Sequence, residues 1–180
     1  ILEAAGCEMG DDGFYYRRYF SEKVGFVISV SAGDQVRIDM AQIAEQELKE
    51  IGMDVSVEIP AQTDWAGQMA FLIGWGSPFD ADDHTYKVFG TDKGANYSSY
   101  SNEKVDKYLT EARQSADPEV RAEAYANFQK ALAEDPAYAM ICYIDANYVA
   151  DSNIKGIDPD TIMGHHGVGI FWNVADWTIE

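Results

Sequence analysis

The sequence predicts an α/β domain, and three neighbouring segments carry this prediction. Residues 24–30, VGFVISV, are apolar and rich in β-branched side chains, which is typical of a buried strand. Residues 35–51 repeat apolar side chains at helical spacing, and residues 53–59 alternate apolar with polar side chains as a half-buried strand does. A strand, a helix and a second strand in this order are the elements of an α/β sheet.

Turn and capping residues predict where these elements begin and end. Ser31-Ala-Gly-Asp34 is expected to turn the chain into the helix, and Gly52 to end it, as a glycine after the last helical turn does. Pro60 ends the second strand because proline cannot donate a backbone hydrogen bond. Earlier in the chain, residues 1–6 are expected to be helical, and GDDG at 10–13 predicts a turn.

A third predicted strand leads into an unusual loop. Residues 63–66 begin like a short capped helix, and residues 70–73 are a short apolar strand. The sequence GWGSPFDADDHTYKVFG follows at 74–90, so this loop lies at the carboxyl end of a strand, where open α/β sheets bind ligands. Helix is expected only near 86–89. The acidic residues expected in a polar loop are Asp80, Asp82 and Asp83.

Two capped helices are predicted in the next part of the chain. Ser101 or Asn102 caps the first, and Asp117 followed by Pro118 begins the second, which Asp135 ends. Apolar side chains at helical spacing predict the two buried faces, which comprise Val105, Tyr108, Leu109 and Ala112 in the first helix and Ala122, Tyr125, Phe128 and Leu132 in the second.

The segment after these helices predicts two more strands. Residues 138–144 form the longest apolar run of the chain and are expected to be a buried strand, with Cys142 as a buried free thiol. Residues 146–150 predict another strand. A disulfide between Cys142 and Cys7 stays open, and neither cysteine has the spacing of a zinc ligand.

The charge of the chain argues against two classes of partner. With 13 basic and 31 acidic residues, the formal net charge is −18, which repels nucleic acids and anionic lipids. No apolar run approaches the roughly 20 residues of a membrane span. The sequence starts at Ile1 with neither a methionine nor a signal peptide, so we expect a fragment of a longer protein.

The acidic loop matches no motif for a metal site or for catalysis. A calcium-binding EF-hand starting at Asp80 requires glycine and glutamate at the positions of Thr85 and Thr91. The sequence also lacks the motifs of phosphate-binding loops, zinc proteases and serine hydrolases. We therefore predict no catalytic residue, no cofactor and no resident metal.

Trp75 is the loop residue that most favours ligand binding. It lies between Gly74 and Gly76, which let backbone groups approach a ligand, and its ring offers a stacking surface. A core tryptophan, with glycines beside it for tight packing, explains the same local sequence. The local pattern leaves both interpretations open.

Five stretches, spread over most of the chain, carry a resemblance to a known family. They are RIDMAQIAEQELKEIGMDVSVEI at 37–59, TDW at 63–65, GWGSPFDADD at 74–83, NYSSYSNEKVDKYLTEAR at 96–113 and DPEVRAEAYANFQKALAEDPAYAMICY at 117–143. In this order they resemble one ligand-binding lobe of the extracellular solute-binding proteins, family 5, of ABC importers, which take up peptides and nickel.

The resemblance implies a periplasmic-binding-protein type II-like lobe, in which helices flank a mixed β-sheet. Residues 1–150 would form the C-terminal ligand-binding lobe, and residues 151–180 would return to an N-terminal lobe that lies outside this chain. The two lobes of such proteins close over a ligand and deliver it to an ABC permease. The resemblance thus implies an extracellular or periplasmic protein, tethered as a lipoprotein in its full-length form, and not an enzyme.

The resemblance also implies which residues face the cleft between the lobes. They are Trp65, Trp75, Gly76, Ser77, Phe79, Asp80, Asn96 and Tyr97. Trp75 and Phe79 would be apolar walls, Asp80 a partner for a cationic group of the ligand, and Asn96 a hydrogen-bonding partner.

Two departures from the family pattern leave other ligands open. Peptide-binding members carry an aspartate where Pro78 stands, and WGSPFD at 75–80 is closer to the WGAPYD-type loop of nickel-binding members. The alternative function is therefore a nickel or metal-chelate carrier with histidine ligands from His84, His165 or His166. A secreted hydrolase that uses the aspartate cluster of the loop is a more remote alternative.

Overall fold

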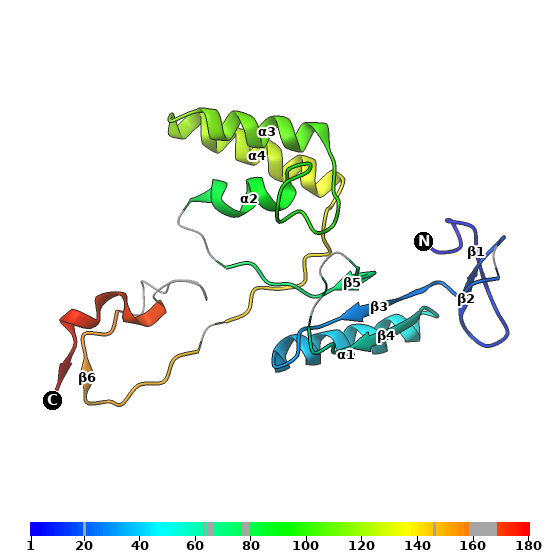
Figure 1. Cartoon of the computed structure of the whole chain (residues 1–180), viewed down its shortest axis with the longest axis horizontal. Coiled ribbons are helices and arrows are strands. Elements are labelled where there is room, and N and C mark those ends of the chain that lie inside the picture. The colour runs from blue at the N-terminus through cyan, green and yellow to red at the C-terminus, as the bar shows by residue number, and fades with distance from the viewer. Residues whose placement is uncertain (20, 63, 65–66, 77–79, 146, 159–168) are drawn as a thin grey trace. The chain divides into compact units, whose positions relative to one another are not determined.

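The chain forms two compact units in the computed structural model, residues 1–74 and residues 75–180. The structure describes every residue except 20, 63, 65–66, 77–79, 146 and 159–168, which Figure 1 draws in grey. Among the described residues, no helix combines the length and the apolar character that crossing a bilayer requires.

The first unit is built around a three-stranded parallel sheet. β3 (Gly25–Ser29) lies between β4 (Asp54–Glu58) and β5 (Ala70–Phe71), in the order β4-β3-β5. Because both pairings are parallel, the three carboxyl ends lie at the same edge of the sheet. The strands predicted at 24–30 and 53–59 are confirmed, and the third predicted strand is shortened to β5.

α1 (Gln35–Glu50) connects β3 to β4 and packs on the sheet (Figure 1). The Asp34 carboxylate caps it by accepting a hydrogen bond of 3.1 Å from the Arg37 N–H, and Gly52, with a φ of +85°, ends it. Parallel strands need such a crossover, and the predicted α/β class is confirmed. The buried core of this unit comprises Ile28, Val30, Ile38, Ala41 and Val55.

The sequence does not predict the antiparallel hairpin that precedes the sheet. β1 (Cys7–Met9) pairs with β2 (Tyr15–Arg17) across the predicted turn at 10–13. The helix expected at residues 1–6 is wrong, because these residues form a single hydrogen-bonded turn. Gly6 leaves this turn with a φ of +84°, and so short a segment cannot recover the entropy that helix nucleation costs.

Three helices form the packed part of the second unit. α2 (Ala81–Phe89) and α4 (Pro118–Glu134) both pack against α3 (Glu103–Gln114) (Figure 1). Asn102 caps α3 and Asp117 caps α4, as predicted. The buried core of this unit comprises Val105, Leu109, Phe128 and Ala131, with Tyr86 and Phe89 of α2 packed against it.

The buried face of α4 differs in part from the prediction. Phe128 is buried as expected, but Ala122 is exposed, and the other buried residues are Ala124 and Ala131. These alanines lie one turn before and one turn after Phe128 on the same face. Small side chains at these positions let two helices approach closely, so the contact stripe follows them.

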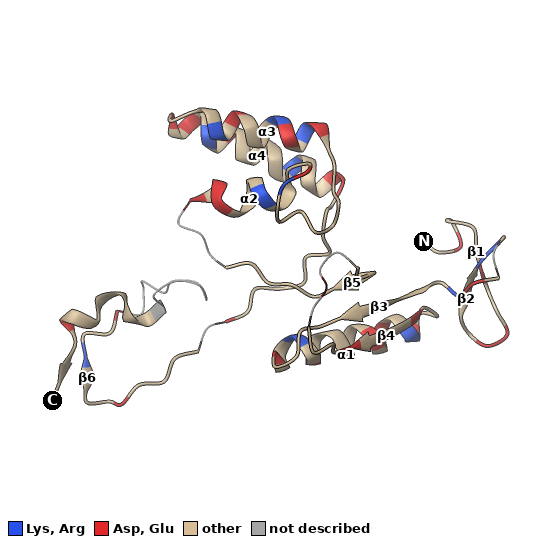
Figure 2. Ribbon diagram, viewed as in Figure 1, with Lys and Arg blue, Asp and Glu red and all other residues tan. Residues whose placement is uncertain are grey.

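The acidic residues of the loop belong to a helix, which corrects the prediction of a polar loop. α2 begins at Ala81 rather than near Tyr86. Asp80 is its capping residue, and Asp82 and Asp83 lie in its first turn, where Figure 2 shows the acidic end of the helix. Negative side chains are favoured at this end by the helix dipole.

The strands predicted at 138–144 and 146–150 are not formed by the described residues of these segments. The side chains there are largely exposed, and Tyr143 and Val149 are fully so, at 102% and 99%. Cys142 is exposed as well, so the prediction of a buried thiol is wrong; it is a free cysteine, as is Cys7. A strand needs a neighbouring strand for its backbone hydrogen bonds, and the described part of this segment pairs with none.

The last described part of the chain is a small antiparallel pair with a 3₁₀ segment. β6 (Ile154–Lys155) pairs with β7 (Thr178–Ile179), and η1 (Gly169–Asp176) precedes β7. The ring centroids of Phe171 and Trp177 lie 5.6 Å apart.

Candidate functional site

Trp75 belongs to a cluster of three rings, Trp75, His84 and Tyr97, which we call the aromatic cluster. The Trp75 ring is stacked on Tyr97, with 6.2 Å between the centroids and an interplanar angle of 10°, and it lies 5.7 Å from the His84 ring. Trp75 and Tyr97 remain 36% and 38% exposed. Because a core tryptophan would be buried, this exposure favours the interpretation of Trp75 as a stacking surface.

α2 carries the capping aspartate and the histidine of the cluster on neighbouring turns. The Asp80 Oδ1 accepts a hydrogen bond of 2.7 Å from the Asp82 N–H. His84 lies in the helix itself, one turn after this cap. Its Nε2 lies 3.6 Å from Oδ2 of Asp83, and its buried Nδ1 has no hydrogen-bond partner among the described residues.

Two arginines from the other helices pair with the acidic end of α2. Arg121 Nη2 lies 2.9 and 3.0 Å from the two carboxylate oxygens of Asp80. The backbone hydrogen bond from Asp82, and then the bond from Arg121, hold the pKa of the Asp80 carboxyl below its usual value. Arg113 Nε lies 3.6 Å from Oδ2 of Asp82, and its guanidinium lies 4.1 Å from the ring centroid of Tyr86.

The side-chain amide of Asn96 is fully engaged in its own loop. Its Nδ2 donates to the carbonyls of Gly90 at 3.0 Å and Tyr100 at 2.7 Å. Its Oδ1 accepts from the Tyr100 N–H at 3.0 Å and from the Ser98 hydroxyl at 3.3 Å. An amide has two N–H donors and two lone pairs, so all four are used. Asn96 thereby holds the loop that carries Tyr97.

Several predicted residues lie outside the part of the chain that the structure describes. Gly76, next to Trp75, is described and half-buried. A side chain at Gly74 would meet the guanidinium of Arg37, the far end of a flexible side chain, which would have to move. The predicted residues outside the described part are Trp65, Ser77, Phe79, His165 and His166.

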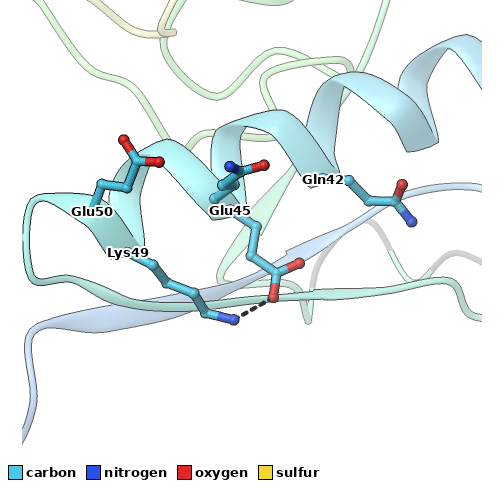
Figure 3. Close-up of a pocket in the computed structure, with 5 residues that line it drawn as sticks. Gln42, Glu45, Lys49 and Glu50 are labelled. Carbon is cyan, nitrogen blue, oxygen red and sulfur yellow. Dashed lines mark hydrogen bonds and ion pairs between the residues drawn. The ribbon is translucent and has the colours of Figure 1, made fainter.

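Two further features of the described residues carry no ligand assignment. These residues contain no group of three or more His, Cys, Asp or Glu side chains placed to hold a metal ion. A hollow on α1 is lined by residues of that helix alone, and an ion pair between Lys49 and Glu45 lies beside it (Figure 3). Because no second element closes it, we assign no ligand to this hollow.

Two features of this region were not predicted from the sequence, the ion pair of Arg121 and the packing of His84 on Trp75. A helix signal was present, since Asp80 followed by two more acidic residues is a typical helix start. No local signal indicates the ion pair, because Asp80 and Arg121 are 41 positions apart in the chain.

Comparisons with known sequences cover nearly the whole chain, although no family model matches it. It is 34% identical over 164 residues to Protein XP55 of Streptomyces lividans and 25% identical over 188 residues to the oligopeptide-binding protein AppA of Bacillus subtilis strain 168. These alignments cover 87% and 98% of the chain but 30% and 33% of the two relatives. The chain thus spans about a third of their length.

Solved structures show the same fold. NikZ from Campylobacter jejuni, in complex with Ni(L-His), is 34% identical with a TM-score of 0.82, and the match covers 98% of this chain and 37% of NikZ. AppA from Bacillus subtilis, in complex with a nonapeptide, is 22% identical with a TM-score of 0.72, covering 99% of this chain and 36% of AppA. The predicted lobe fold is therefore confirmed.

Proposed function

Because the chain belongs to the extracellular solute-binding proteins of family 5 and matches the C-terminal part of its relatives, we propose that the whole protein captures an oligopeptide or dipeptide for an ABC importer. The observation that carries this proposal is the pair of exposed stacked rings, Trp75 and Tyr97, on a chain similar over 98% of its length to a ligand-binding protein.

The proposed mechanism is reversible capture between two lobes. Residues 1–150 form part of the C-terminal lobe, residues 151–180 return to the N-terminal lobe, and closure of the two lobes buries the ligand. The site proposed on this lobe contains Trp65, Trp75, Gly76, Ser77, Phe79 and Tyr97 as contacts. Asp80 and Asn96 hold the contact residues in place, since their hydrogen bonds are made within the second unit.

The partners and the location follow from the same proposal. Two solved structures with a similar fold are named as a periplasmic EDTA-binding protein and a periplasmic oligopeptide-binding protein. We place this protein in the periplasm or outside the cell, tethered as a lipoprotein in its full-length form, with an ABC permease as its membrane partner and no catalytic step of its own.

Native mass spectrometry of the full-length protein, purified without refolding, tests the proposed cargo. Closure buries the ligand, so a carrier retains it through purification. We expect a series of bound masses that match peptides. Bound masses that contain a metal, with no peptide series, would contradict the peptide function.

Replacing Trp75 with alanine tests the site itself. In the full-length protein, Trp75→Ala should weaken peptide binding at least tenfold, because a stacked aromatic surface is lost. Tyr19→Ala is the matched control, since Tyr19 is an exposed ring, at 86%, outside the aromatic cluster. Equal affinities of the two variants would remove Trp75 from the site.

A nickel or metal-chelate cargo is the second candidate function. The identity of 34% with NikZ and the position of His84 against Trp75 favour it. Calorimetric titration of the ligand-free full-length protein with Ni(L-His) tests it. Heat of binding that disappears in His84→Ala would support the chelate function, and no heat at all would exclude it.

A further inference from the structure

We propose that Arg121 is a specificity-determining residue: by occupying the Asp80 carboxylate, it prevents the aromatic cluster from selecting a ligand with a free amino group at this face. This inference rests on the proposed peptide function. Arg121 lies outside the GWG loop, and its contacts are with Asp80, the Ala112 carbonyl and the Tyr125 ring, not with the rings of the aromatic cluster.

Asp80 begins the helix that carries a ring of the cluster. It caps α2, and His84, in the next turn of this helix, packs on Trp75. A carboxylate at the start of this helix offers an anchor for an ammonium group of a ligand held by the cluster.

The acceptor positions of this carboxylate are nearly all taken. An ionised carboxylate has about four lone-pair positions. The Asp82 N–H uses one at Oδ1, and Arg121 Nη2 approaches both Oδ1 and Oδ2. The Asp80 side chain is 60% exposed, so an incoming ammonium group could reach it, but it would have to displace the guanidinium or use the one position that is left.

Arg121 is itself held in place, which makes displacement costly. Its Nη1 donates a hydrogen bond of 3.2 Å to the Ala112 carbonyl near the end of α3, and its guanidinium lies 5.6 Å from the ring centroid of Tyr125. Its side chain is 25% exposed. A planar group bound at two places keeps its geometry better than a free surface cation does.

Among the described residues, the other polar side chain predicted at this face cannot replace Asp80. Asn96 has both donors and both lone pairs engaged in its loop. Of the described residues predicted there, the exposed rings of Trp75 and Tyr97 are therefore the surface offered to the ligand, and such a surface selects for shape and apolar area rather than for positive charge.

Binding of two peptide ladders to the full-length protein tests this inference. The probes are leucine peptides from dipeptide to nonapeptide, offered once with free and once with acetylated amino termini. Native mass spectrometry gives the ratio of the two affinities for each protein. Arg121→Met should raise the preference for free amines about tenfold, because it frees a carboxylate for a charge-assisted hydrogen bond. Lys130→Met, which removes another positive charge from α4, should leave the ratio unchanged.

Asp80→Asn provides a second arm. As a single variant, which does not depend on the folding of Arg121→Met, it should have the same ratio as the wild-type protein. Combined with Arg121→Met, it should cancel the preference that Arg121→Met gains. A tenfold fall of the ratio in Asp80→Asn alone would overturn the inference, and so would an unchanged ratio in folded Arg121→Met. If the wild-type protein bound neither ladder, the peptide function would be overturned and the inference with it. The two failures are distinct, because the outcomes that overturn the inference alone require a wild-type protein that binds peptides.

Discussion

The α3–α4 pair and the segment 138–150 are neighbours in the sequence and both are rich in apolar side chains, yet only the helices bury them. Val105 and Leu109 are fully buried, whereas Tyr143 and Val149 are fully exposed. Each helix has its packing partner a few residues away in the chain, across the short connection between Gln114 and Pro118.

The difference teaches that apolar content alone does not make a core. A helix satisfies its backbone hydrogen bonds within itself and needs only a surface to pack on. A strand needs another backbone beside it, and the described residues of 138–150 have none. The apolar run at 138–144 therefore predicts a strand whose partner the described part of this chain does not supply.

The largest effect that tests this comparison is expected from the helix core. Phe128→Ala should lower the free energy of unfolding of the α3–α4 pair by about 3–5 kcal/mol, because it opens a cavity against Phe89 and Leu109. Val149→Ala should change it by less than about 0.5 kcal/mol. Hydrogen exchange of the α3 and α4 amides measures both. Similar losses in the two variants would break the comparison.

A smaller effect is expected from the loop between α2 and α3. Asn96→Ala should cost about 1–3 kcal/mol, because it leaves the carbonyls of Gly90 and Tyr100 without their donor. Asn96→Asp should cost at least as much, since it places a carboxylate against these two carbonyls. Exchange rates of the amides at 90–100 provide the measurement. If either variant matched the wild type, the loop would be held by other contacts.

The cap of α3 should contribute less again. The Asn102 side chain accepts hydrogen bonds from the N–H groups of Lys104 and Val105, at 3.0 and 3.3 Å. Asn102→Ala should therefore destabilise α3 by about 1 kcal/mol, and Asn102→Ser should recover most of this loss. Thermal unfolding of both variants distinguishes them. Equal melting temperatures for the alanine and serine variants would contradict a capping role.

The smallest effect is expected from acid. The folded protein lowers the pKa of Asp80 below the ordinary value of 3.8, so the ionised carboxylate favours the folded state. This contribution is present above pH 3.8 and is lost as the pH falls further, through the pKa of the folded state. Acid titration followed by exchange at the first turn of α2 should show the loss in the wild type. Asp80→Asn should lack this component, while Asp83→Asn, as control, should retain it.

Much of the fold was predictable because its signals are local. The caps at Asp34, Asn102 and Asp117 and the apolar spacing of three helices predicted α1, α3 and α4. Alternation and β-branching predicted the strands of the parallel sheet. The hairpin of β1 and β2 was missed because each strand has only three residues, which is too short to show a periodic apolar signal.

The ligand-binding site stays a prediction, and the structure describes the surroundings of some of its residues. The choice of Trp75 and Tyr97 agrees with two exposed rings that stack on each other. Asp80 and Asn96 were also predicted as ligand contacts, but the polar atoms of both side chains are used in ion pairing, capping and loop bonding. A sequence shows that a residue is polar, and only the fold shows how many of its hydrogen bonds are already made.

By itself, the sequence determined the helices with their caps, the α/β class and the family resemblance, because these depend on residues within a few turns or on the order of segments. The tertiary structure alone decided that Arg121 pairs with Asp80 across 41 positions and that His84 packs on Trp75. It also decided that the apolar run at 138–144 is largely exposed. The physical reason is that ion pairs, ring packing and strand pairing require partners that the chain brings together only when it folds.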